Sequence, residues 1–321
     1  MAGLRIGAKF SGDVPVAETL DLAVMAERLG YSSLWVNETR FTRDAVTRIS
    51  AIAAATTTAA LGTAVLNPYT RSLMLLTITA ATIDEISKGR FILGMGVGTK
   101  RYLSSEGIIR SHPLIRLEEY VLLMRRLWNG EKVSFNGKAL EVSQVKLDFK
   151  PFRNNIPIYI GATEERGLRF AANIANGIIL NGYTPKSHAM SVKEIVGSNS
   201  KVSVLGNVMV SMDQDEEKAI EGARLLAYTY LTSIPTIANA NAISHDFIEE
   251  LKALEKKQGA STAMIHLPDR MIKNAVAVGT PEQCKKWILD YSQSGPDEVL
   301  VTRIHGNTRQ IIHQVAELFT I

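Results

Sequence analysis

The amino-acid sequence predicts a (β/α)8 TIM barrel, in which eight parallel strands alternate with helices. The chain has 321 residues, a length that suits either two ordinary domains or one large barrel. Short runs rich in β-branched residues alternate with longer stretches of helical periodicity, as parallel strands with helical crossovers require. A doubly wound sheet fits less well, because no glycine fingerprint opens a helix after the first strand. We therefore expect a single domain over residues 1–321.

Four strand–helix units fill the first hundred residues. Apolar and β-branched runs predict strands at 4–10, 33–37, 61–66 and 90–97. Between them, spacings of three and four apolar residues predict helices at 16–29, near 43–55 and from about 70 to 87. Gly30 follows the first helix in the position of a C-terminal cap.

The second half of the chain continues this alternation with two interruptions. Residues 132–148 predict a small hairpin, with Asn136-Gly137 as its turn. Residues 213–275 carry a helical pattern without a convincing strand, so we interpret them as an insertion between the last two strands. The remaining strands are expected at 156–160, 178–180, 202–210 and 298–302.

Composition excludes several classes of protein. A hydrophobic content of 46% excludes a fibrous or disordered chain. Basic residues exceed acidic ones by 36 − 32 = 4 and are scattered, so we expect no nucleic-acid partner. Cys284 is the only cysteine, and no window reaches the length of a membrane span, so we expect a cytoplasmic protein without a membrane contact. The six histidines show no ligand spacing, so no metal site is expected.

Active sites of such barrels lie at the carboxyl ends of the strands. Glu38 is the acid–base candidate there, although a glutamate at such a position is more often simply a solvated loop residue. The glycines of 94–98 fit either the close approach of a flat ligand or tight packing of the barrel. The glycines near residues 161 and 182 fit either a phosphate site or ordinary loops. The residues at or just past the carboxyl ends of the predicted strands are Lys9, Glu38, Asn67, Gly98, Thr99, Lys100, Gly161, Ala162, Thr163, Asn181, Gly182 and His305.

Two blocks, residues 61–72 (LGTAVLNPYTRS) and 80–98 (AATIDEISKGRFILGMGVG), resemble the bacterial luciferase-like superfamily. Within it they are most similar to the coenzyme F420-dependent branch typified by methylenetetrahydromethanopterin reductase. Residues 157–162 and 175–181 continue the likeness, which covers most of the chain outside 213–275. The resemblance implies a barrel with a late insertion, and hydride transfer to or from a deazaflavin across the strand ends.

The resemblance also implies roles for particular residues. A non-proline cis peptide that supports the ring would fall at Ala64-Val65. Glu38 and Thr39 stand where relatives have an Asp-His pair, so the carboxylate is kept and the imidazole is not. Lys9 and Thr99 replace two acids of the reductase, which argues against its pterin substrate and favours an anionic or carbonyl one near Lys9 and Lys100. The remaining cofactor contacts implied are Asn67, Gly98, Thr99, Gly161, Ala162, Thr163, Gly177, Asn181 and Gly182.

Three functions stay open at this point. The first is an F420-dependent oxidoreductase acting on a small organic molecule, with Glu38 positioning the cofactor or relaying a proton. The second is an FMN-dependent monooxygenase of the same superfamily, which normally has a histidine where Thr39 stands. The third is a barrel that has lost catalysis and only binds or assembles. In each case we expect a homodimer or a higher homo-oligomer, because the family pairs through early barrel helices.

Overall fold

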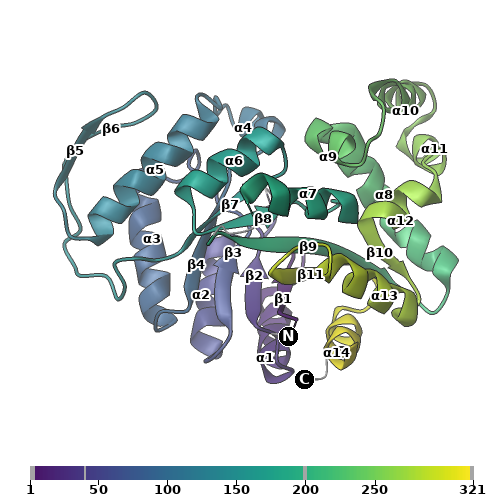
Figure 1. Cartoon of the computed structure of the whole chain (residues 1–321), viewed down its shortest axis with the longest axis horizontal. Coiled ribbons are helices and arrows are strands. Elements are labelled where there is room, and N and C mark those ends of the chain that lie inside the picture. Colours follow the sequence, from purple (N-terminus) through teal and green to yellow (C-terminus); the bar gives the residue numbers. More distant parts are fainter. Residues whose placement is uncertain (1–3, 40, 198–200, 319–321) are drawn as a thin grey trace. The chain divides into compact units, whose positions relative to one another are not determined.

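The computed structural model describes residues 4–39, 41–197 and 201–318 (Figure 1). Nine strands form one sheet in the order β10-β9-β11-β1-β2-β3-β4-β7-β8, and β8 also pairs with β9. This second pairing of β9 closes a ring of eight strands, which confirms the predicted barrel. The strands of the sheet are β1 (Ile6–Phe10), β2 (Ser33–Val36), β3 (Ala60–Thr63), β4 (Phe91–Met95), β7 (Ile158–Ala162), β8 (Gly177–Leu180), β9 (Ser203–Met212), β10 (Val276–Gly279) and β11 (Glu298–His305).

The ninth strand, β10, corrects the sequence prediction, which placed no strand between 210 and 298. It pairs in parallel with the last four residues of β9, from Met209 to Met212. Only four residues long and directly preceded by a helix, it offers too few alternations for its pattern to be recognised. The predicted hairpin is confirmed as β5 (Val133–Asn136) and β6 (Glu141–Val145), which pair antiparallel.

Helices follow the strands at nearly all the expected positions. Side-chain caps explain where several begin, because a side-chain oxygen accepts one of the free N–H groups of the first turn. Asp44 caps α2 in this way, Ser72 caps α3, and Thr280 forms a capping box with Gln283 at α13. The helices are α1 (Val16–Arg28), α2 (Ala45–Ala55), α3 (Leu73–Ile86), α4 (Lys100–Ser105), α5 (Pro113–Trp128), α6 (Glu165–Ile174), α7 (Lys186–Val196), α8 (Glu216–Ser233), α9 (Pro235–Ala240), α10 (His245–Gln258), α11 (Ala260–Ile265), α12 (Asp269–Ala275), α13 (Pro281–Ser292) and α14 (Thr308–Leu318).

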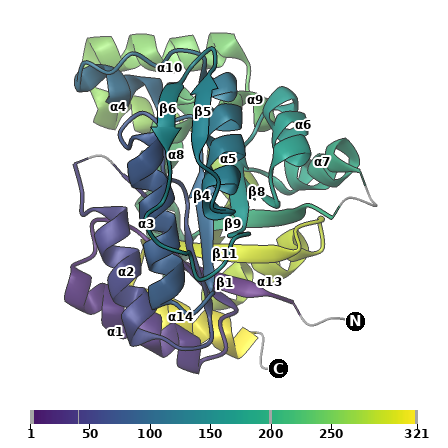
Figure 2. The same ribbon diagram turned by 90° about the vertical axis from the view of Figure 1, so that its left-hand side faces the viewer.

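Contacts within the chain divide it into two compact units, which we call unit A and unit B. Unit A comprises Lys9–Ala162 and Arg169–Ile179, and unit B contains the other described residues. In unit A, helices α1, α2, α3 and α5 pack one against the next, and the hairpin lies against α5 (Figure 2). In unit B, the predicted insertion is confirmed as α8 to α12, whose apolar side chains form one buried cluster with β10. None of the helices in the described ranges combines the length and the apolar character that crossing a membrane needs.

Candidate functional site

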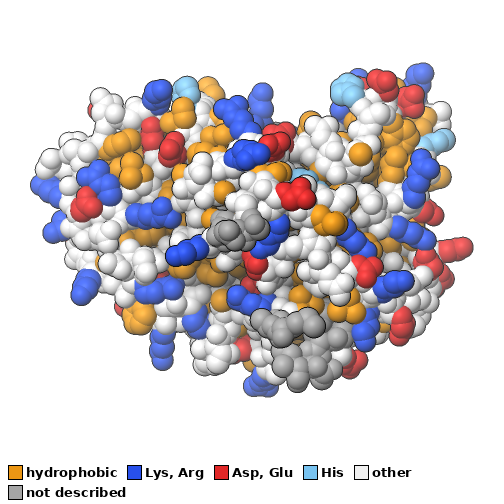
Figure 3. Space-filling view, in the orientation of Figure 1, with side chains coloured by type: hydrophobic (Ala, Val, Ile, Leu, Met, Phe, Trp, Pro, Cys, Tyr) orange, Lys and Arg blue, Asp and Glu red, His pale blue; other side chains and the backbone are white. Residues whose placement is uncertain are grey.

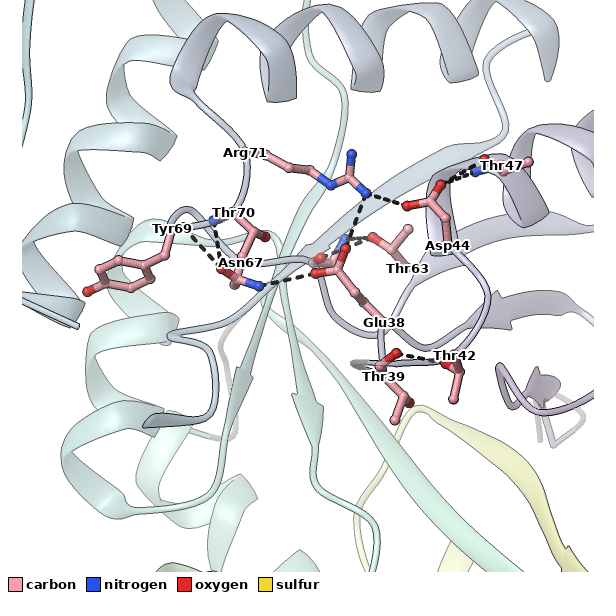
Figure 4. A network of polar contacts seen from close by, with 11 residues as sticks. Glu38, Thr39, Thr42, Asp44, Thr47, Thr63, Asn67, Tyr69, Thr70 and Arg71 are labelled. Carbon is pink, nitrogen blue, oxygen red and sulfur yellow. Dashed lines mark hydrogen bonds and ion pairs between the residues drawn. The ribbon is translucent and has the colours of Figure 1, made fainter. Parts of the chain in front are cut away.

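A network of polar contacts joins the segments that follow β2 and β3 in unit A (Figure 4). The side-chain amide of Asn67 donates to Glu38 Oε2 at 3.1 Å. Its carbonyl oxygen accepts from the backbone N–H groups of Tyr69 and Thr70, at 3.0 and 3.2 Å. Asn67 is almost fully buried, and these three hydrogen bonds define which way its amide faces. The structure therefore brings together two of the predicted site residues, Glu38 and Asn67.

Arg71 is the cation of this network. Its Nη2 lies 3.2 Å from Glu38 Oε1 and 2.7 Å from Asp44 Oδ2. Burial tends to raise the pKa of Asp44, but hydrogen bonds from Thr47 and the charge of Arg71 lower this pKa overall. Because Asp44 is also the N-cap of α2, Arg71 ties the first turn of that helix to the end of β2.

Both carboxylate oxygens of Glu38 therefore accept a hydrogen bond, one from the Arg71 guanidinium and the other from the Asn67 amide. A carboxylate that accepts hydrogen bonds at both oxygens is held in one orientation. Glu38 was expected to position the cofactor or to relay a proton, and these contacts fit the first role, exerted through Asn67.

Three polar atoms around this network are buried and have no hydrogen-bond partner among the described residues. They are Asn37 Oδ1, Thr70 Oγ1 and Arg71 Nε. Buried polar groups are almost always paired, so such a cluster indicates that a ligand or ordered water completes it. One acceptor, one hydroxyl and one N–H donor are a suitable set for the alternating C=O and N–H groups of a deazaflavin pyrimidine ring.

The peptide bond between Ala64 and Val65 is cis, as the resemblance implied. The side chain of Val65 lies beside two glycines of neighbouring strands. A Cβ on Gly96 would be 2.6 Å from Val65 Cγ2, and one on Gly161 would be 3.4 Å from Val65 Cγ1. Val65 and Gly161, both predicted site residues, thus lie together and form a small apolar shelf at the carboxyl ends of β3, β4 and β7.

The other predicted residues of unit A lie at different depths. Gly98 adopts a left-handed backbone (φ 69°), and a Cβ there would be 3.4 Å from Asn67 Cβ. Thr99 and Lys100 are exposed at the start of α4 and belong to the rim. Gly177 begins β8 and so lies at the amino end of its strand, where its missing side chain leaves room for the Tyr159 ring. We leave Gly177 out of the proposed cofactor contacts for this reason.

The predicted residues of unit B form a separate group. The Thr184 hydroxyl donates to the carbonyl oxygen of Asn181 at 2.5 Å. Gly182 lies against Met209: a Cβ added to Gly182 would be only 2.3 Å from Met209 Cε. The His188 side chain forms a hydrogen bond with the Thr163 backbone. Its Nε2 atom is buried and has no hydrogen-bond partner among the described residues. Burial lowers the pKa of His188, and the Thr163 bond opposes this effect.

Lys9 lies on the inner face of the barrel wall. The backbone N–H of Asn37 donates to Phe10 O at 3.4 Å, and in a parallel ladder this bond places Lys9 beside Trp35. Trp35 and the Tyr159 ring of β7 are 6.1 Å apart between centroids, although two strands separate β2 from β7 in the sheet. Both rings must therefore point into the barrel, and Lys9 shares their face.

The Lys9 ammonium has no ion pair or hydrogen bond with any residue that the structure describes. Burial lowers its pKa from 10.5 to about 8. Replacing Lys9 by methionine should therefore raise the free energy of unfolding at pH 7 by about 1 to 2 kcal/mol, since it removes a partly buried charge that has no partner among the described residues.

The stability change should depend on pH with a definite sign. Between about 8 and 10.5 the unfolded chain holds a proton that the folded protein has released, so the stability of the wild type rises with pH there. The difference between Lys9→Met and wild type should therefore be largest below pH 8 and shrink towards pH 10.5. Urea unfolding at several pH values measures it, and a difference that does not change with pH would contradict the buried charge.

Charge elsewhere is dispersed. On the face shown in Figure 3, Lys and Arg side chains are spread among acidic and hydrophobic ones. Among the described residues no three His, Cys, Asp or Glu side chains gather closely enough to hold a metal ion.

Sequence reasoning missed Arg71 and Asp44 as members of the site. Arg71 stands four residues after Asn67 within the block that carries the resemblance. Its role depends on contacts with residues 27 and 33 positions away, so no local pattern could assign it.

The chain is similar to known proteins over most of its length. The chain is 29% identical over 310 residues to the 5,10-methylenetetrahydromethanopterin reductase of Archaeoglobus fulgidus, covering 92% of each. The coenzyme F420-dependent tetrahydromethanopterin reductase of Methanopyrus kandleri has the same fold, with a TM-score of 0.87, 23% identity and 99% of each chain covered. An F420-dependent secondary alcohol dehydrogenase, solved with an F420–acetone adduct, gives a TM-score of 0.81 at 19% identity, with 99% and 98% covered. The luciferase-like monooxygenase family model matches residues 2–298, and the chain therefore belongs to that family.

Proposed function

We propose that the protein is a coenzyme F420-dependent oxidoreductase acting on a small organic molecule. The observation that carries this proposal is the set of unpartnered polar atoms around Asn67, next to the apolar shelf of Val65. A flat heterocycle needs both features, an apolar support for its face and polar partners for its edge. The two solved structures named above, which are described as F420-dependent enzymes, support the same cofactor.

Each group of residues has a part in this proposal. Val65, with Gly161 beside it, supports the ring face, and Asn67 presents its remaining amide hydrogen to the ring edge. Glu38 and Arg71 hold that amide in place. The deazaflavin supplies or accepts a hydride when bound. Further contacts with the cofactor are proposed for Thr39, Ala64, Gly98, Thr99, Ala162, Thr163, Asn181 and Gly182, and with substrate for Lys9 and Lys100.

Thermal unfolding with saturating F420 or FMN tests the cofactor. We expect F420 to stabilise the protein by a few kcal/mol, about 3 at a hundredfold excess over Kd, and FMN to have little effect. F420 fluorescence quenching should give the same affinity. A larger shift with FMN than with F420 would favour the monooxygenase alternative and contradict the proposal.

We also propose that the protein forms a homodimer through α3. Leu75, Ile78 and Ile86 are 50%, 40% and 41% exposed along one face of this helix, an unusual apolar exposure for a free surface. Ile78→Glu should convert the dimer to a monomer in size-exclusion chromatography with light scattering. The exposed Glu118→Gln on α5 serves as control and should leave the mass unchanged. A wild type that is already monomeric would contradict this assembly.

Two further expectations from the sequence stay proposals. We propose that units A and B belong to one barrel domain, since β1 and β8 each contribute residues to both. We propose a cytoplasmic location, which the single Cys284, fully buried, supports.

A further inference from the structure

The chain lacks the ionisable groups that the resemblance led us to expect near the reacting atoms. Threonines stand at 39 and 99, and neither side chain titrates in the physiological range. Glu38 remains, but Arg71 and Asn67 occupy its two oxygens. Reduction of a carbonyl nevertheless requires a proton as well as a hydride. Another group must therefore hold this proton.

Lys9 meets the requirements for that group. It lies on the inner face of the barrel beside Trp35, one residue before the carboxyl end of β1. The ends of β1 and β2 are joined by the Asn37–Phe10 hydrogen bond, so Lys9 and the Glu38–Asn67 network occupy the same end of unit A. The Lys9 side chain is partly buried, and its ammonium has no ion pair or hydrogen bond with any described residue. Charged groups that are partly desolvated in this way and have no partner are concentrated at functional sites.

The charged groups around β1 leave Lys9 uncompensated. The loop that follows β1, residues 11–13, accepts hydrogen bonds at its backbone carbonyl oxygens from the side chains of Arg43 and Arg48. Asp13 on this loop acts through its charge to raise the pKa of Arg48. Glu298, Arg303 and His305 lie on β11. Burial accounts for the lowered pKa of Lys9, and no charged side chain among the described residues contributes to it.

We infer that Lys9 is the catalytic acid that protonates the oxygen of a carbonyl substrate during its reduction. This inference rests on the proposed function. The hydride from the reduced deazaflavin forms a C–H bond at the carbonyl carbon, and the C=O π bond breaks. The oxygen takes a proton from the Lys9 ammonium, which water then restores. The deazaflavin is oxidised by two electrons, the carbonyl is reduced to an alcohol, and the reverse reaction uses the neutral amine as base.

The test uses the whole chain with F420 and two carbonyl probes, acetone and cyclohexanone. Lys9→Met and Lys9→Arg should lower kcat at least 100-fold, the low end for acid–base groups, because neither side chain donates a proton near neutral pH. The exposed Lys132→Met serves as control and should behave as wild type. F420 affinity from fluorescence quenching should change less than threefold in all variants, which separates loss of the acid from loss of the cofactor site.

Two readouts, the pH profile of kcat and chemical rescue, distinguish an acid from a structural lysine, and a third measures the titration of Lys9 directly. In the wild type, kcat for carbonyl reduction should fall as pH rises above about 8, and this break should vanish in Lys9→Met. Added methylammonium should restore part of the activity of Lys9→Ala but have no effect on the wild type. Lysine-selective NMR of the cofactor-free protein should show one signal, absent in Lys9→Met, that titrates near 8.

Each negative result has a separate meaning. If Lys9→Met keeps kcat within fivefold of wild type, or the pH break persists in it, Lys9 is not the acid. If the wild type binds F420 but reduces neither probe, the carbonyl assignment and the role of Lys9 are both wrong. If the wild type does not bind F420 at all, the proposed function itself fails.

Discussion

Gly94→Ala is expected to lower the free energy of unfolding by about 3 kcal/mol or more. A Cβ at this position would overlap the carbonyl oxygen of Thr63 on the neighbouring strand. The two strands cannot separate to make room, because two hydrogen bonds join them at this point. The Thr63 hydroxyl donates to the Gly94 carbonyl oxygen at 3.0 Å and accepts from the Gly94 N–H at 3.1 Å. Thr63 directly precedes the Ala64–Val65 bond, so the shelf should also be displaced and F420 binding lost.

Gly161→Ala is the matched control for this substitution. Its Cβ would meet Val65 at 3.4 and 3.5 Å, which is ordinary van der Waals contact. Stability should change by less than about 1 kcal/mol, whereas F420 affinity should fall at least tenfold if this surface carries the cofactor. Urea unfolding and fluorescence titration measure the two effects. Equal free energies of unfolding for Gly94→Ala and Gly161→Ala would contradict the tight packing of Gly94 against Thr63.

Arg71→Gln should produce the second large effect. It removes one cation from two carboxylates at once, and the side chains of Arg71 and Glu38 are only 16% and 10% exposed. We expect a loss of about 2 kcal/mol in the free energy of unfolding, because a mostly buried charge is left without its partner. F420 affinity should fall at least tenfold, since Glu38 is no longer held against Asn67.

The loss of stability in Arg71→Gln should diminish as pH falls. Arg71 helps to lower the pKa of Asp44 below its usual 3.8, so the pair stabilises the folded state above that pH and ceases to do so once Asp44 is protonated. Arg126→Gln is the control, because Arg126 and Glu131 form an exposed ion pair at 2.8 Å. Such pairs contribute less than about 1 kcal/mol. A change in Arg126→Gln as large as that in Arg71→Gln would contradict the network.

The order of strands and helices could be predicted because it depends on local periodicity. Runs such as Phe91–Met95 have the pattern of a buried strand, and Asp44 and Ser72 cap helices from neighbouring positions in sequence. The strand Val276–Gly279 was not predicted, because four apolar residues are too few to be told apart from the apolar residues of a neighbouring helix. The site was predicted in outline for the same reason, since parallel strands place the residues that follow them at one end.

By itself, the sequence determined the barrel, the late insertion and the set of residues at the strand ends, and its family resemblance implied the position of the cis bond. The tertiary structure decided what those residues do. It showed that Gly94 serves packing, that Arg71 and Asn67 engage Glu38, and that Lys9 is partly buried without a counter-charge among the described residues. The physical reason is the same in all three cases. Each property depends on the distance between atoms of different strands, and only the folded chain sets that distance.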